Sequence, residues 1–235
     1  MKAIDFMNQL QKNPEYIEMQ KQKEREMQLK LAEIKNIEAS FINDLQANGF
    51  DIQASGDLLK LKKVDAKLAE LLLMWLPKIS DKHNSQQMLV RALAIAEKPF
   101  NGKILMQLFD SEESSDGLKW AIGNTIASAS VLNIEGWLEA KLNASQQGKQ
   151  NEMLIYAAAK YFDYVKAESL FKKLFDIYPL QVADVFSKVG NGEDLKFLQL
   201  KSKNYSGEVH KQIVKYIAQL KKRLGNQGNV ALAKS

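Results

Sequence analysis

Residue types that carry enzyme chemistry are sparse in this 235-residue chain. The chain has no cysteine and two histidines, so disulfides, thiolate nucleophiles and zinc sites built on Cys or several His are excluded. A nucleophilic triad would need His83 or His210 as its base. His83 stands at an expected helix start and His210 on a basic terminal helix. The ordinary interpretation of each is an exposed histidine near a helix end.

Sequence motifs for phosphate binding and hydrolysis do not occur either. Gly190-Asn191-Gly192 lacks the preceding strand and the third glycine of a dinucleotide-binding loop, and G-x-x-x-x-G-K-[ST], G-x-S-x-G and H-E-x-x-H are absent. The acids Glu112-Glu113, Asp116 and Glu193-Asp194 stand where they would stabilise the start of a following helix. We therefore expect no catalytic residue, no metal site and no cofactor.

The most informative constellation comes from three segments that align without gaps, at 89–94, 118–123 and 154–159. Each places an apolar, a large and a small residue at matching positions. In equivalent stacked helices the large residues lie side by side, with further side chains one turn away on the same face. This predicted partner-binding stripe consists of Arg91, Asp116, Trp120, Asn124, Glu152, Tyr156 and Lys160.

Two interpretations of the stripe remain open. Exposed Trp, Tyr and Arg side chains are enriched in the hot spots of protein interfaces. Alternatively, Trp120 and Tyr156 pack between helices as core and expose only their polar atoms. The sequence does not decide between these two cases.

The elements that must position these residues have a helical period nearly throughout. Asn13-Pro14-Glu15 is typical of a helix start, and Asn48-Gly49 of a helix end. The first half of this long helix, to Lys35, is rich in charges of both signs and is expected to project or lie on the surface. Its apolar stripe, through Met27, Leu31, Ile34 and Phe41, is expected to fold back on the first repeat rather than pair with another copy.

The rest of the chain is predicted as an all-α array. Residues 50–63 form a linker with a short helical turn, for which a small hairpin is the alternative. Helices are then expected at 65–76, 84–97, 100–110, 116–129, 134–145, 150–162, 165–177, 179–189, 193–202 and 207–224. The predicted organisation is a long helix with linker over 1–62, a repeat array over 63–226 and a flexible tail over 227–235.

The aligned segments resemble a known repeat family. Arg91-Ala92-Leu93-Ala94 and the run from Gly117 to Asn124 resemble the second helices of HEAT repeats. In particular they are similar to those of small bacterial HEAT-repeat proteins that pair a long N-terminal helix with about five repeats. The resemblance implies an α-solenoid of about five helix pairs whose second helices line a concave face, and a role in molecular interaction. Residues after Phe162 depart from the pattern.

The resemblance also brings in an enzyme as the weakest alternative. HEAT-like folds include DNA glycosylases for alkylated bases, which use Trp and acidic residues in a basic groove, and Trp120 with Asp116 is faintly similar. However, the stripe sets Asp116 and Glu152 against Arg91 and Lys160. That mixture of charges does not attract phosphate.

Charge is distributed unevenly along the chain. Residues 196–235 hold nine Lys or Arg and one acid, Glu208, whereas the whole chain has a net charge of +5. Lys211, Lys215 and Lys222 fall on one face of the last helix. Because such a row of positive charges can bind phosphates, nucleic-acid binding is the second hypothesis. A polar outer face that caps the terminal repeat explains them equally well.

The leading hypothesis is a non-enzymatic module that binds an unidentified protein partner on its concave face. The longest apolar run, Leu71 to Leu76, is far shorter than the about 20 residues that span a bilayer. Charges interrupt the first residues, so no secretory signal is expected. We therefore expect a cytoplasmic protein that does not bind membranes, and favour a monomer.

Overall fold

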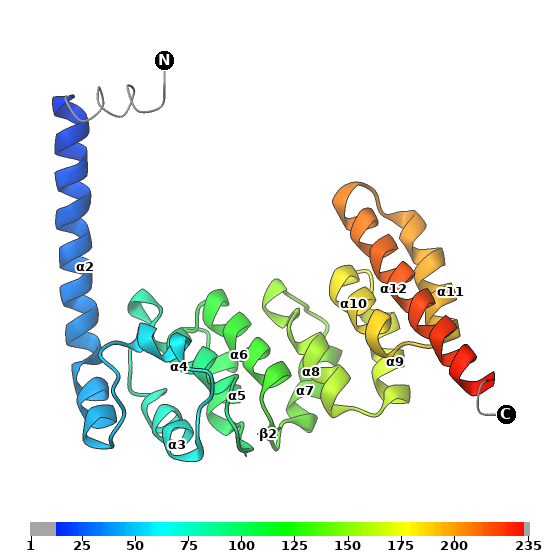
Figure 1. Ribbon diagram of the computed structural model, residues 1–235, viewed down its shortest axis with the longest axis horizontal. Coiled ribbons are helices and arrows are strands. Elements are labelled where there is room, and N and C mark those ends of the chain that lie inside the picture. Colours follow the sequence, from blue (N-terminus) through cyan, green and yellow to red (C-terminus); the bar gives the residue numbers. More distant parts are fainter. Residues whose placement is uncertain (1–12, 233–235) are drawn as a thin grey trace.

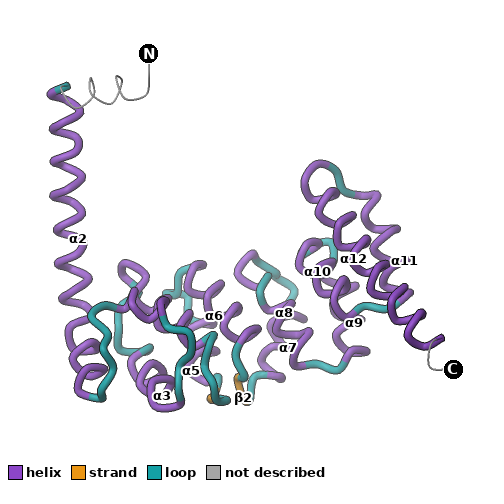
Figure 2. The backbone as a smooth tube through the Cα atoms, in the orientation of Figure 1, coloured by secondary structure: helices purple, strands orange, loops and turns teal. Residues whose placement is uncertain are grey.

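The computed structural model describes residues 13–232 and confirms an all-α protein, with two short strands in the described region (Figures 1 and 2). The first elements are the helix α2, which spans Pro14–Ala47, and the 3-10 turn η1, which spans Ser55–Lys60. The remaining α-helices are α3 (Ala66–Trp75), α4 (Ser85–Leu93), α5 (Lys103–Asp110), α6 (Asp116–Ser128), α7 (Glu135–Asn143), α8 (Leu154–Tyr161), α9 (Tyr164–Leu174), α10 (Pro179–Val189), α11 (Gly192–Lys201) and α12 (Gly207–Leu232).

Helix α2 stands away from the rest of the chain over its first half (Figure 1). The side chain of Asn13 caps its start by accepting the backbone N–H of Glu15 at 2.9 Å, and Gly49 follows its end with a φ of +91°. Met27 and Leu31 are 57% and 51% exposed. The prediction that the stripe folds back is therefore wrong at Met27 and Leu31, which the array does not reach, and is confirmed at Phe41, which is fully buried.

The second half of α2 is anchored to the array by packing and by buried polar contacts. Phe41 is fully buried with its ring 5.9 Å from that of Trp75. Glu38 is 2% exposed and accepts the backbone N–H of Ser55 at 2.8 Å and the hydroxyl of Ser85 at 2.7 Å. Residues 50–63 contain the turn η1, so the linker prediction is confirmed and the hairpin alternative is wrong.

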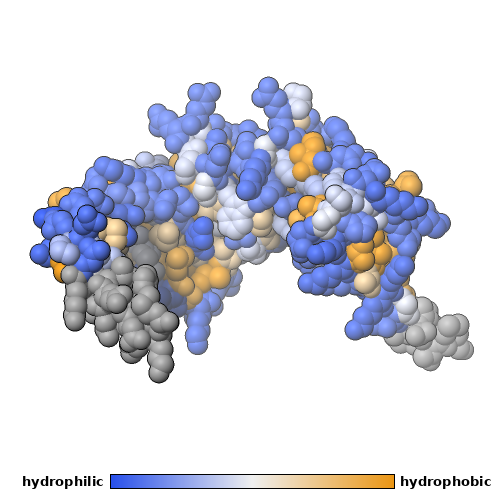
Figure 3. Space-filling model, turned by 90° about the horizontal axis from the view of Figure 1, so that it is seen from above, coloured by the Kyte–Doolittle hydropathy of each residue, from blue (hydrophilic) through white to orange (hydrophobic). Residues whose placement is uncertain are grey.

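The later helices stack on one another in sequence. Close backbone contacts join α4 to α6, α6 to α8, α8 to α10 and α10 to α12, and we call these five helices the stacked row. Each of them also contacts the helix before it, from α3 with α4 to α11 with α12. Seen from above, the molecule is curved and hollowed on one side (Figure 3).

Several predicted boundaries differ from the structure. The helix predicted from residue 100 starts at Lys103, because Phe100–Asn101 (β1) pairs in parallel with Val131–Leu132 (β2). The helix predicted to residue 97 ends at Leu93, and Ala96 instead bridges to Val64. α12 continues to Leu232, past the predicted start of a tail at 227. Residues 1–12 and 233–235, which belong to the predicted first and last regions, lie outside the described residues.

Candidate functional site

Helix α6 holds the centre of the predicted stripe. Ser115 caps its start by accepting the backbone N–H of Leu118 at 3.2 Å. Leu118 and Ile122 are fully buried, which turns the opposite face, with Trp120, away from the core. Thr125 is also fully buried and donates its hydroxyl to the carbonyl of Val90 at 2.7 Å, which ties α6 to α4. The position of Trp120 is therefore fixed by contacts on the buried face of its helix.

Trp120 on α6 contacts residues of the two neighbouring parts of the array. Its Nε1–H donates at 2.8 Å to Oε1 of Glu152, in the turn just before α8, and the guanidinium carbon of Arg91 on α4 lies 5.8 Å from its ring centroid. Glu152 Oε2 in turn accepts from Gln181 on α10 at 3.0 Å. The indole is half-buried, so it is neither a free platform nor full core.

A pocket adjoins the Trp120 ring. It has a volume of about 410 Å³, and we call it the Trp120 pocket. Its lining consists of Asp116, Gly117, Trp120, Lys149, Gln150 and Glu152. The structure thus brings three residues of the predicted stripe, Asp116, Trp120 and Glu152, to one pocket. Asp116 and Lys149 are exposed, and they place opposite charges at the pocket.

Tyr156 is the second aromatic residue of the stripe and lies outside the Trp120 pocket. It is half-buried, and the Nζ of Lys188 lies 5.6 Å from its ring centroid. Burial, followed by the charge of Asp184, raises the pKa of the Tyr156 hydroxyl far above its ordinary value. Asp184 also pairs with Lys188 at 2.8 Å. Tyr156 is therefore a neutral hydroxyl beside an ion pair.

Lys160 and Asn124, like Arg91 and Tyr156, do not line the pocket. Lys160 donates its Nζ to the carbonyls of Ser128 at 3.1 Å and Ala129 at 2.5 Å, at the end of α6. Burial lowers the pKa of the Lys160 ammonium. Asn124 is half-buried on α6, one turn beyond Trp120. Lys160 thus caps the end of α6, and its contact with a partner stays a prediction.

Sequence reasoning missed several residues of this surface. Lys149 and Gln150 lie in the short turn η3 (Lys149–Asn151) before α8, outside the aligned helical segments. Gln181 and Lys188 lie on α10, beyond the point at which the repeat pattern fades. The i, i+4 rule applied to α10 relates Gln181, Asp184 and Lys188, and this spacing is the signal that was available.

The two histidines have structural partners. His83 is not the exposed residue that was expected, because 19% of its side chain is exposed and its Nε2 lies 2.8 Å from Glu33 on α2. Its backbone φ of +63° is left-handed, so it precedes α4 in a tight turn. His210 contacts the carbonyl of Ser202 through Nδ1 at 2.9 Å, and because a carbonyl can only accept, Nδ1 carries the proton.

The basic face of α12 is exposed as well. Lys211, Lys215 and Lys222 all lie in solvent, and Lys211 is 3.6 Å from Glu208. Ile213 and Leu220 are fully buried on the opposite side. The three lysines therefore form one accessible row along the last helix.

Within residues 13–232, no three His, Cys, Asp or Glu side chains are grouped to hold a metal ion. No helix in that same range is both long and apolar enough to cross a bilayer. Comparison with known protein families, with curated proteins and with solved structures finds no match for this chain.

Proposed function

We propose that the chain is a non-enzymatic protein-binding module built as a short HEAT-like solenoid. In this proposal the described helices form about five pairs after α2, and the stacked row lines the hollow visible in Figure 3. Support comes from the successive contacts of α4, α6, α8, α10 and α12. The helices of the stacked row contact one another more closely than the helices that precede them do. The array therefore bends so that the stacked row lies on its concave side, which offers a binding surface.

The observation that carries the proposal is the Trp120 pocket. A half-buried indole, fixed by Glu152 and faced by Arg91, presents a rigid aromatic surface beside a cavity of about 410 Å³. Because its N–H is already bonded, the ring can gain little from reorientation and loses little entropy on binding. Fixed aromatic anchors at the edge of a pocket are typical of interface hot spots.

The charges beside the pocket indicate what the partner segment contains. Asp116 and Lys149 are exposed and opposite in sign, while the Glu152 carboxylate accepts hydrogen bonds from Trp120 and Gln181. A peptide with an apolar or aromatic side chain for the pocket, flanked by one basic and one acidic residue, complements this arrangement. Opposite charges at the edge of the Trp120 pocket determine the orientation and register of the bound peptide more than its affinity.

A charge reversal tests the proposal without touching the core. The variant Asp116→Lys/Lys149→Glu should lose most of the partner captured by the tagged wild-type chain from its native extract. The matched control is Glu70→Lys/Lys103→Glu, because these residues are also exposed but lie on α3 and α5, away from the pocket. Equal capture by the two variants would remove the Trp120 pocket from the binding surface.

A second candidate function, nucleic-acid binding, is favoured by the exposed row Lys211, Lys215 and Lys222. Each phosphate that these lysines neutralise would release counterions, so binding would fall steeply with salt. Anisotropy of labelled duplex DNA, single-stranded DNA and RNA at two salt concentrations measures this directly. Replacing the three lysines by Gln should flatten the salt dependence if the row is the contact surface.

A further inference from the structure

Arg91 stands beside the Trp120 pocket without lining it. The residue is exposed on α4, and its guanidinium carbon lies 5.8 Å from the centroid of the Trp120 ring. This distance is within the range of cation–π attraction, which restrains a long side chain against an aromatic face. The guanidinium is therefore held at the edge of the proposed binding surface.

The N–H donors of Arg91 are unused in the described part of the chain. Within residues 13–232 its guanidinium forms no ion pair, and its side chain donates no hydrogen bond. A guanidinium carries five N–H donors in a planar fork that matches the two oxygens of a carboxylate. The whole fork of Arg91 is thus open to a carboxylate of a partner.

Other cations beside aromatic rings of the stacked row are already engaged. Lys188 on α10 lies 5.6 Å from the centroid of the Tyr156 ring, but it pairs with Asp184 at 2.8 Å. Lys160 on α8 donates its Nζ to carbonyls at the end of α6. Of these three cations, Arg91 is the one whose donors have no acceptor among the residues that the structure describes.

Acids on the neighbouring elements do not satisfy Arg91. Asp57 lies in η1, which packs against α4, and pairs with Lys60 at 2.7 Å. Glu152 accepts a hydrogen bond with each of its carboxylate oxygens. Asp116 is exposed and lines the Trp120 pocket. Because acids and bases are mixed on this surface, recognition by Arg91 depends on its fork and not on an excess of positive charge.

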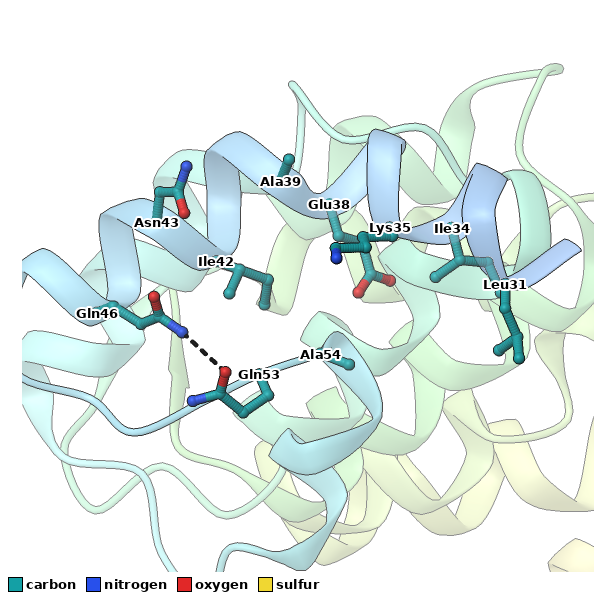
Figure 4. Close-up of a pocket in the computed structure, with 10 residues that line it drawn as sticks. All are labelled: Leu31, Ile34, Lys35, Glu38, Ala39, Ile42, Asn43, Gln46, Gln53 and Ala54. Atoms are coloured by element: carbon teal, nitrogen blue, oxygen red, sulfur yellow. Dashed lines mark hydrogen bonds between the residues drawn. The ribbon is translucent and has the colours of Figure 1, made fainter. Parts of the chain in front are cut away.

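The cavity at the base of α2 lacks such a selective group (Figure 4). It has a volume of about 420 Å³ and lies between α2 and the segment Gln53-Ala54. Lys35 and Glu38 place opposite charges in its lining, and Glu24 and Glu26 stand exposed among the lysines of the helix above it. These charges do not favour one kind of occupant.

The order of the helices places Arg91 and Lys149 on opposite sides of Trp120. α4, which carries Arg91, contacts α6 from one side, and η3, which holds Lys149, contacts it from the other (Figure 1). A carboxylate bound to the guanidinium would lie within about 10 Å of the Trp120 ring centroid. An extended peptide advances about 3.3 Å per residue, so this carboxylate belongs to a residue within about three positions of the pocket anchor.

We propose that Arg91 binds a side-chain carboxylate of the partner segment, on the α4 side of the residue that enters the Trp120 pocket. This inference rests on the proposed function, because it adds a contact to the same binding surface. The fork forms two parallel N–H···O bonds with the carboxylate, and the Trp120 ring restrains the fork for that contact. Arg91 is therefore a specificity-determining residue, which selects partners by the position of one acid.

Peptides selected on the full chain test the assignment. A random peptide library displayed on phage is selected on the wild-type chain and counter-selected on the Asp116→Lys/Lys149→Glu variant, so that the remaining peptides depend on the Trp120 pocket. We expect these peptides to share an apolar or aromatic residue with Asp or Glu within about three positions of it. The tightest binder is synthesised with an amidated C-terminus, and each of its acids is replaced in turn by the corresponding amide.

A double-mutant cycle, measured by fluorescence anisotropy, then isolates the contact. Arg91→Gln should weaken binding of the acidic peptide about fivefold or more, and it should leave binding of one of the amide peptides unchanged. Arg91→Lys keeps the charge without the fork, so its affinity should lie between those of wild type and Arg91→Gln. The matched control is Lys78→Gln, because Lys78 is also exposed and lies 5.3 Å from the ring centroid of Trp75, after the end of α3 and away from the pocket.

The outcomes separate the Arg91 contact from the pocket itself. Equal losses with Arg91→Gln and Lys78→Gln would indicate a diffuse attraction and overturn the assignment. Pocket-dependent peptides without an acid that couples to Arg91 would also overturn it, while the proposed function would stand. Peptides that bind the Asp116→Lys/Lys149→Glu variant as tightly as wild type, or a selection that yields no peptide, would contradict the proposed function and the Arg91 contact together.

Discussion

The Nε1–H of Trp120 on α6 donates at 2.8 Å to Glu152, which lies 32 residues further along the chain in the turn before α8. The same arrangement recurs at the other two tryptophans, because Trp75 donates to Asp44 at 2.7 Å and Trp137 to Asp110 at 3.1 Å. Each indole thereby connects its helix to a carboxylate on another segment through a charge-assisted hydrogen bond. At Trp120 this bond also fixes the ring that borders the candidate pocket.

The Trp120–Glu152 bond should contribute measurably to stability. Glu152→Leu leaves the indole N–H and the Gln181 amide without their acceptor, and we expect a loss of about 1–2 kcal/mol in the free energy of unfolding. Glu152→Gln keeps an oxygen acceptor for the indole and should cost less. Urea denaturation followed by circular dichroism measures both variants. Equal stability of Glu152→Leu and wild type would show that the bond does not hold α6 against α8.

The buried hydroxyl of Thr125 gives a second, cleaner test of the contact between α4 and α6. Thr125→Val preserves the shape but leaves the carbonyl of Val90 without this donor, so a loss of about 1 kcal/mol is expected. Thr125→Ser retains the hydroxyl and serves as the matched control for the hydrogen bond, apart from the small cost of one methyl group. A valine variant as stable as the serine variant would contradict the assignment.

Two helical glycines should respond in opposite directions to alanine. A Cβ at Gly123 would lie 2.9 Å from the Cβ of Met153, so Gly123→Ala should push α6 and α8 apart and destabilise the chain by about 1–2 kcal/mol. Gly136 has nothing within 4 Å of its added Cβ, and Gly136→Ala should stabilise the chain by up to about 1 kcal/mol through helix propensity. Thermal melts of the two variants check the sign. A stabilising Gly123→Ala would mean that close helix approach is not required there.

The contact between Glu33 and the turn before α4 should depend on pH. Hydrogen bonds from Lys82, and then from His83, lower the pKa of the Glu33 carboxyl below its ordinary value of 4.5. A carboxyl with a lowered pKa in the folded chain contributes stability above its ordinary pKa, and this contribution is lost as the pH falls through the folded value. The protection of the backbone amides around His83, measured as the exchange rate relative to the intrinsic rate at each pH, should therefore fall below pH 4.5 in wild type.

The matched control for this pH effect is Glu33→Gln, which cannot titrate. In that variant the protection of the amides near His83 should start lower and should lack the acid-dependent step. A titration of the Glu33 carboxyl by NMR with a midpoint at or above 4.5 would contradict the role assigned to Lys82 and His83.

Local sequence signals were sufficient for most of the helices. Asn13 with Pro14, Ser115 before α6 and Gly49 after α2 stand at the predicted starts and ends, because caps and left-handed glycines act within one turn. The strand pair at Phe100–Asn101 was not predictable in this way. Its partner Val131–Leu132 lies on a later segment, and two residues are too few to show alternation.

The sequence predicted which helix face carries the candidate site, but not how far each side chain on that face is buried. Helical spacing correctly placed Asp116, Trp120 and Asn124 on one face of α6, opposite Leu118. Whether a side chain is available to a partner depends on the groups of the neighbouring helix that it contacts, and the spacing of residues in the sequence does not show those groups. For that reason the sequence could not show that Lys160 caps the end of α6.

The behaviour of α2 shows the same limit. Its apolar stripe is continuous in sequence, yet Phe41 is fully buried and Leu31 is half-exposed, because the array ends between them. A stripe predicts which face is apolar, and the length of the array decides how much of that face is covered.

Site-specific photo-crosslinking from position 149 tests the central proposal most directly. A photo-reactive residue in place of Lys149 lies at the Trp120 pocket, and one in place of Lys103 on α5 is the matched control. We expect one predominant crosslinked protein from position 149, which disappears when Asp116→Lys is added, and no corresponding product from position 103. Equal products from both positions, or crosslinking to nucleic acid alone, would contradict it.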